Sequence, residues 1–151
     1  MDSTANALMA KGFLIFLIAL GFAMLFSISG CATGMTREEL LMQMQEGSEP
    51  LIVDVRSQGE YDRDHVPGAV HIPFYAVGSI LRERGFPKKE PLVLYCEHGP
   101  RAGMAAFTLR LSGYEKVYSL EGHMKGWRKN EFPREMNASR NSATPPLDQL
   151  R

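Results

Sequence analysis

One short stretch constrains the fold of this chain most strongly, namely an apolar run that leads directly into Cys96. The run Leu92–Tyr95 lacks a polar face, which is typical of a strand buried on both sides in a parallel sheet. The residues that follow, from about Arg101, favour a helix. Cys96 is therefore expected at the carboxyl end of a strand and under the start of a helix, where open α/β sheets bind their ligands.

The loop after this cysteine has the spacing of an anion-binding cradle. It consists of Glu97, His98, Gly99, Pro100, Arg101 and Ala102. Four residues separate Cys96 from Arg101, so the backbone N–H groups of the loop can point at the sulfur. The positive end of the helix and the charge of Arg101 both favour thiolate over thiol. Cys96 is thus a candidate nucleophile, and the competing interpretation is a buried cysteine that only packs.

The rest of the chain alternates short apolar runs with segments that favour helices. Thr36 and Glu39 have the spacing of a helix capping box, and Gly47 is expected to end that helix. The expected order is helix 37–46, strand 51–55, a short helix from residue 60, strand 70–72, a helical turn at 78–83, strand 92–95, a helix from 101 to the stop at Gly113, strand 116–120 and helix 122–129. This order predicts an α/β fold with a parallel central sheet flanked by helices on both faces.

The composition indicates one globular domain and argues against a nucleic-acid partner. A length of 151 residues with 44% apolar residues suffices for a single core. Lys+Arg and Asp+Glu both total 17, so no overall positive field attracts nucleic acid. Two cysteines cannot form a disulfide framework, and the four histidines lack ligand spacing around them. We therefore expect no metal and no cofactor, and no feature points to a particular protein partner.

Several motifs occur in a fixed order along the chain. They are Asp54-Val55-Arg56, Glu60-Tyr61, His65-Val66-Pro67-Gly68-Ala69 with Ile72-Pro73, the Cys96 to Arg101 loop, Gly113-Tyr114, and Gly122 with Gly126-Trp127. Over residues 35–132 their order and spacing resemble those of a rhodanese-like domain. The resemblance implies a single-domain sulfurtransferase with Cys96 as its catalytic residue. Structural support is expected from Asp54, Arg56, Glu60 and His65.

The chemistry implied by this resemblance is transfer of a sulfane sulfur. The Cys96 thiolate would attack the outer sulfur of a small anionic donor such as thiosulfate, or of a persulfide, and hold it as a persulfide. A thiol or cyanide would then accept the sulfur, while the loop amides stabilise the anionic sulfur. Related cell-cycle phosphatases have a loop that is one residue longer, so the six-residue loop of this chain favours sulfur over phosphate.

Two positions depart from the pattern of the family and keep other functions open. Glu97 stands where thiosulfate-using members often have a basic residue, and we expect its carboxylate to repel an anionic donor. His123 follows Gly122 where relatives commonly have a second glycine, so a positive φ there would strain it. The alternatives are a non-catalytic sulfur-carrier or regulatory binding module, and a cysteine-based oxyanion reductase or phosphatase.

The first 30 residues have the character of a signal peptide or membrane anchor. Residues 12–26 are uncharged and strongly apolar, and no charged residue occurs between Lys11 and Arg37. Ile28-Ser29-Gly30-Cys31 resembles the lipobox of bacterial lipoproteins, which implies lipidation of Cys31; the alternative is an uncleaved transmembrane anchor. If this segment acts as a signal, either anchor predicts a membrane-tethered domain at the periplasmic or cell-envelope face of a bacterium, whereas an anchor of reversed orientation would leave the domain in the cytoplasm. Residues 133–151 are polar and are expected to form a disordered tail.

Overall fold

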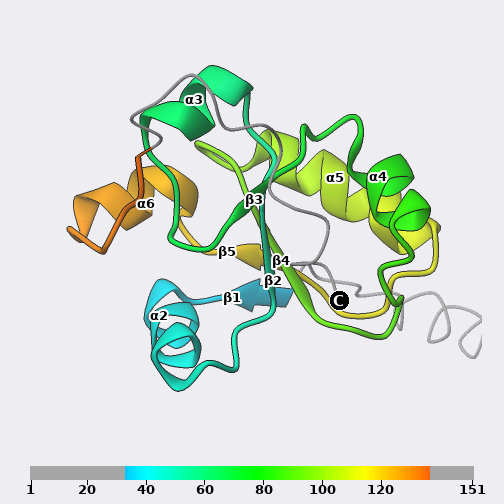
Figure 1. The fold of residues 1–151 in the computed structure, drawn as a ribbon, viewed down its shortest axis with the longest axis horizontal. Helices are drawn as coiled ribbons and strands as arrows, with labels where there is room; N and C mark the ends of the chain where they lie inside the picture. Colours follow the sequence, from blue (N-terminus) through cyan, green and yellow to red (C-terminus); the bar gives the residue numbers. More distant parts are fainter. Residues whose placement is uncertain (1–32, 137–151) are drawn as a thin grey trace, which may run out of the picture. The chain divides into compact units, whose positions relative to one another are not determined.

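A parallel five-stranded sheet forms the centre of the domain (Figure 1). The computed structural model describes residues 33–136. The strands are β1 (Thr33–Met35), β2 (Leu51–Asp54), β3 (Val70–His71), β4 (Leu92–Tyr95) and β5 (Val117–Leu120). They lie in the order β1-β5-β4-β2-β3, and every neighbouring pair is parallel. The expected parallel sheet is therefore confirmed, with β4, the strand that leads to Cys96, at its centre.

Five helices accompany these strands in the described part of the chain. They are α2 (Arg37–Glu46), α3 (Gln58–Arg63), α4 (Val77–Glu83), α5 (Pro100–Leu111) and α6 (His123–Lys129). Helix α2 begins after Thr36, whose hydroxyl accepts a hydrogen bond from the Glu39 N–H at 3.1 Å. It ends at Gly47, which adopts the left-handed conformation that glycine tolerates best. The helix expected at 37–46 is thus confirmed.

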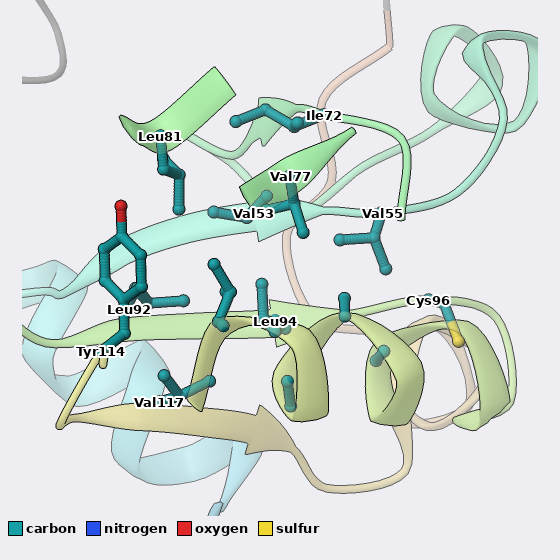
Figure 2. Packing of buried hydrophobic residues seen from close by; sticks show 14 of the residues in the cluster. Val53, Val55, Ile72, Val77, Leu81, Leu92, Leu94, Cys96, Tyr114 and Val117 are labelled. Atoms are coloured by element: carbon teal, nitrogen blue, oxygen red, sulfur yellow. The ribbon is translucent and has the colours of Figure 1, made fainter. Parts of the chain in front are cut away.

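The strands bury side chains on both faces of the sheet because the first three residues of β2 and all of β4 are apolar. On one face Val53, Leu92 and Leu94 pack against α4 and α5, as Figure 2 shows for much of this cluster. On the other face Ile52 and Val93 belong to a cluster that draws on helices α2, α3 and α6. The members supplied by these helices are Leu40, Tyr61, Met124 and Trp127. Helices on both faces of the sheet are therefore confirmed.

Helix α5 lies close to the sheet because its inner side chains are small. Its buried residues are Ala102, Ala105, Ala106 and Leu109, which recur at the spacing of one helical face. The face expected from the sequence is therefore the buried one. A closely packed α5 places its first turn directly over the end of β4.

Among the strands of residues 33–136, β1 is the one that we did not expect from the sequence. The segment Thr33–Met35 pairs in parallel with β5, for example Gly34 with Ser119. Three residues that include a glycine carry no strand pattern, so this strand depends on its pairing with β5. At the other end of the chain, the Glu135 N–H donates to the His65 carbonyl at 2.9 Å. The packed chain thus extends past the boundary expected at residue 132, and residues 137–151 of the expected tail lie outside the described range.

The membrane-directed segment predicted for residues 1–30, with Cys31, lies outside the described residues. Among residues 33–136, no helix combines the length and the apolar character needed to cross a bilayer.

Candidate active site

The Cys96 sulfur lies where the sequence placed it, at the carboxyl end of β4 and beside the start of α5. The side chain belongs to the core cluster on the α4 and α5 side, and Figure 2 shows its sulfur at the edge of that cluster. Its exposed fraction is 1%. The Gly99 N–H donates a hydrogen bond to Sγ at 3.1 Å. Within the described part of the chain, Gly99 is the loop amide that makes this contact, and it stabilises negative charge on the sulfur.

The backbone of the loop is held by glycine and by the first turn of α6. Gly99 has a φ of 121°, which side-chain-bearing residues rarely adopt. Two α6 amides donate to loop carbonyls, Met124 N–H to Cys96 at 3.0 Å and Lys125 N–H to Glu97 at 3.3 Å. The loop is therefore held by α6, which lies on the opposite face of the sheet from α5, as well as by α5 itself.

His123 packs directly against this loop. A Cβ atom on Gly99 would lie 3.0 Å from His123 Nε2, so the ring occupies the space that a glycine leaves open. His123 has a φ of 50°, which is the strained backbone that the Gly122-His123 sequence led us to expect. Burial, with a smaller contribution from the charge of His98, lowers the pKa of His123 below 6.5. The ring is therefore neutral at pH 7 and acts as a packing wall of the loop. His98 itself is exposed.

Arg101 is fixed beside the cysteine by Glu60. Its Nη1 and Nη2 atoms donate to the two Glu60 oxygens at 2.7 and 2.8 Å. The Glu60 hydrogen bond, with smaller contributions from the Glu60 and Cys96 charges, raises the pKa of Arg101. The same carboxylate accepts hydrogen bonds from the Ser57 N–H and hydroxyl at the start of α3. Glu60 thus links the α3 N-terminus to the cation that stands next to the sulfur.

The pairing with Arg101 makes the contribution of Glu60 to stability dependent on pH. The Arg101 hydrogen bond holds the pKa of Glu60 well below its ordinary value of 4.5. A carboxylate with a lowered pKa contributes fully above the pKa of the unfolded chain, and this contribution is lost as the pH falls towards the folded value. We expect Glu60→Gln to cost roughly 1–2 kcal/mol at pH 7. This deficit should shrink below pH 4.5 in urea titrations, and a deficit that grows on acidification would contradict the assignment.

Asp54 and Arg56 form a buried pair behind the loop. Arg56 Nε lies 2.9 Å from both Asp54 oxygens, and Nη2 lies 2.7 Å from Oδ2. Both side chains are fully buried. Burial acts to lower the pKa of Arg56, but the hydrogen bonds and charge of Asp54 and its neighbours outweigh it, so the net pKa is raised. Arg56 also donates to the Asp64 carbonyl at 2.5 Å, so the pair connects β2 to the end of α3.

Glu97 does not present a free carboxylate to an incoming anion. Its two oxygens accept from Arg128 Nη1 and Nη2 at 2.6 and 2.7 Å, and Arg56 Nη1 lies 3.4 Å away. Arg128 Nε in turn donates to Asp64 at 2.8 Å. The charge of Glu97 is offset mainly by Arg128, with Arg56 further away, which weakens the repulsion that we expected from the sequence.

Arg128 is a site residue that the sequence did not reveal. It lies 31 positions beyond Glu97, in the last turn of α6. Basic residues are common at the end of a helix because they interact favourably with the helix dipole, so Arg128 did not indicate a site. The signal that could have suggested it is the acidic residue after Cys96, because a half-buried carboxylate requires a partner.

The other residues that we expected at the site pack in the domain or hold neighbouring segments in place. Pro100 is the first residue of α5, and Ala102 is fully buried in its first turn. His65 stacks on Tyr61 with ring centroids 3.9 Å apart, and its Nδ1 lies 2.8 Å from the Tyr61 carbonyl oxygen. His65 thus holds the segment that follows α3, while the groups around the sulfur are the Gly99 amide and Arg101.

A parallel sheet with a cysteine loop between β4 and α5 defines a class of α/β proteins. Comparison with known proteins identifies the family within this class. The chain belongs to the rhodanese-like family, because the family model described as Rhodanese-like domain matches residues 36–130. It is 30% identical over 94 residues to the thiosulfate sulfurtransferase GlpE of Glaesserella parasuis serovar 5 (strain SH0165). That match covers 62% of this chain and 85% of the relative.

Two solved structures illustrate the likeness in three dimensions. The Alr3790 protein from Anabaena sp. is 25% identical with a TM-score of 0.60, and the match covers 68% of this chain and 81% of that one. The BH2092 protein from Bacillus halodurans is 23% identical with a TM-score of 0.64, and the match covers 82% and 90%. The second likeness concerns the fold alone.

Proposed function

We propose that the protein is a sulfurtransferase that carries a sulfane sulfur on Cys96. The observation that carries this proposal is the position of Sγ at the end of β4, where it accepts the Gly99 N–H at 3.1 Å beside the paired Arg101. An anionic sulfur is stabilised there by a backbone amide, a nearby cation and the start of α5. The similarity to a relative named as a thiosulfate sulfurtransferase supports thiosulfate as one donor.

The proposed reaction has two displacement steps. In the first, the Cys96 thiolate attacks the outer sulfur of thiosulfate, a new S–S bond forms, and sulfite leaves with the electron pair of the broken bond. In the second, a thiolate or cyanide attacks the outer sulfur of the persulfide, and the electron pair returns to Cys96 Sγ. Sulfur atoms and electrons balance over the cycle, so neither step needs an external oxidant or reductant.

The intermediate provides the direct test of this function. Full-length protein in detergent, incubated with thiosulfate or polysulfide, should gain the mass of one sulfur atom, and reduction with dithiothreitol should remove it. The Cys96→Ser variant should gain nothing, since the serine oxygen cannot form a persulfide. If the native protein stays unmodified with both donors, the binding or regulatory module replaces the enzyme as the best interpretation.

We propose in addition that the domain is tethered to a membrane through its first 31 residues. The support is the uncharged apolar run at residues 12–26 followed by Ile28-Ser29-Gly30-Cys31. In a bacterial host, the protein should incorporate labelled palmitate, and Cys31→Ser should abolish this labelling while Cys96→Ser leaves it intact. Full-length, unlabelled protein in the membrane fraction would favour the transmembrane anchor, and protein found only in the soluble fraction would overturn the tether.

A further inference from the structure

A cavity of about 440 Å³ lies next to the site, on the α4 side of the sheet. Its volume falls in the range of small-molecule binding sites. Its walls come from the start of α3, the connection between β3 and α4, helix α4, and the first turn of α5. Its lining includes the side chains of Phe74, Tyr75, Ile80, Arg84 and Arg101. Arg101 belongs to the first turn of α5, which lies over the end of β4 that leads to Cys96, so this cavity lies next to the place where the sulfur is held.

The charges around this cavity are positive. Within residues 33–136, no carboxylate lines it, and its cationic residues are Arg56, Arg84 and Arg101. The Arg56 side chain is fully buried against Asp54, and Arg101 is paired with Glu60. Arg84 is half-buried and makes no ion pair with any residue between 33 and 136. A partly desolvated guanidinium without a counterion favours the binding of an anion, above all a carboxylate that matches its planar donors.

The remaining walls are apolar. The rings of Phe74 and Tyr75 meet edge to face with centroids 5.4 Å apart, and Ile80 of α4 adds an aliphatic side chain. Tyr75 is 78% exposed, so its ring leaves apolar surface open to water beside the cavity. An inorganic anion such as thiosulfate has no carbon atoms to cover this surface, and it is small for such a volume. The cavity therefore fits an organic anion with a short carbon chain.

We propose that this cavity binds the sulfur acceptor, and that the acceptor is a small thiol carrying a carboxylate. The proposal rests on the sulfurtransferase function of Cys96. The carboxylate binds Arg84, the carbon chain lies against Phe74 and Tyr75, and the thiol reaches the sulfur past Arg101. Its thiolate attacks the outer sulfur of the Cys96 persulfide, the new S–S bond forms, and the electron pair of the broken bond stays on Sγ.

The test compares two thiols of similar size that differ in charge. With 3-mercaptopropionate and 2-mercaptoethanol as acceptors, the ratio of their kcat/KM values measures the selectivity for a carboxylate. Arg84→Ala should lower this ratio about fivefold through KM, the effect of one partly exposed ion pair, and added salt should reduce the difference. Arg84→Lys should keep most of the selectivity. The matched control is Arg82→Ala, which removes an exposed arginine of α4 that does not line the cavity and should leave the ratio unchanged.

A selectivity ratio that stays within twofold in Arg84→Ala, or that falls equally in Arg82→Ala, would overturn the assignment. A second measurement separates this outcome from a failure of the enzyme function. In ¹H–¹⁵N spectra of full-length Cys96→Ser in detergent, 3-mercaptopropionate should shift the Phe74, Tyr75 and Ile80 amides. The shifts should be absent with 2-mercaptoethanol and in the Cys96→Ser/Arg84→Ala variant. Absence of shifts in Cys96→Ser would reject the carboxylate site even if sulfur transfer is demonstrated.

Discussion

Replacing Gly99 by alanine should lower the rate of sulfur transfer by roughly a hundredfold, the cost of losing one positioned donor to a reacting anion. Gly99 has a φ of 121°, and a Cβ atom there would lie 3.0 Å from His123 Nε2. The loop must therefore shift, and the N–H that donates to Cys96 Sγ moves with it. Single-turnover transfer from thiosulfate to Cys96, followed by intact mass, measures the rate.

The matched control for this change is Gly103→Ala on the outer face of α5. A Cβ atom at Gly103 meets no neighbouring atom, and alanine favours the helix by about 1 kcal/mol. That variant should keep the native rate within twofold and gain stability. Adding His123→Ala to Gly99→Ala removes the close contact but leaves the unfavourable φ, so little activity should return. A Gly99→Ala rate within threefold of the native rate would show that the amide is not needed.

Replacing Arg56 by methionine should cost about 3–5 kcal/mol of the free energy of unfolding. The methionine leaves the Asp54 carboxylate fully buried without its partner, and the hydrogen bond to the Asp64 carbonyl is lost. Because small domains have a total stability of about 5–15 kcal/mol, much of the variant should be unfolded. Guanidinium titrations followed by circular dichroism measure the change in the free energy of unfolding.

Two further variants keep this prediction testable even if Arg56→Met fails to accumulate. Asp54→Leu together with Arg56→Met removes both charges and should recover part of the loss, because the buried carboxylate is then gone. Arg63→Met changes an exposed arginine on α3 and should cost less than 0.5 kcal/mol, about the usual limit for surface sites. A loss below 1 kcal/mol for Arg56→Met would contradict the role assigned to the pair.

Features encoded by local patterns could be predicted from the sequence. The apolar run before Cys96 and the small-residue face of α5 each lie within about a dozen residues, and both occur in the structure as expected. The fold class followed from their alternation, since parallel strands joined by helices allow few arrangements.

Features created by distant contacts could not be predicted in this way. Strand β1 is a strand because β5 supplies its hydrogen bonds, and its own residues carry no strand pattern. The compensation of Glu97 depends on Arg128, which only the position of α6 brings within 2.6 Å. The sequence shows the charge of Glu97 without its tertiary partner, so it could not indicate that Arg128 offsets this charge in the folded protein.

The contacts between α6 and the cysteine loop also determine when this loop can form during synthesis. The loop receives the Met124 and Lys125 amides and the Arg128 guanidinium, all from the last helix of the described domain. Strand β1 likewise cannot pair until β5 has been synthesised. A ribosome must therefore release almost the whole domain before the chain can close these long-range contacts, and such topologies fold slowly. The surroundings of Cys96 thus reach their native geometry late, only after the final helix has docked.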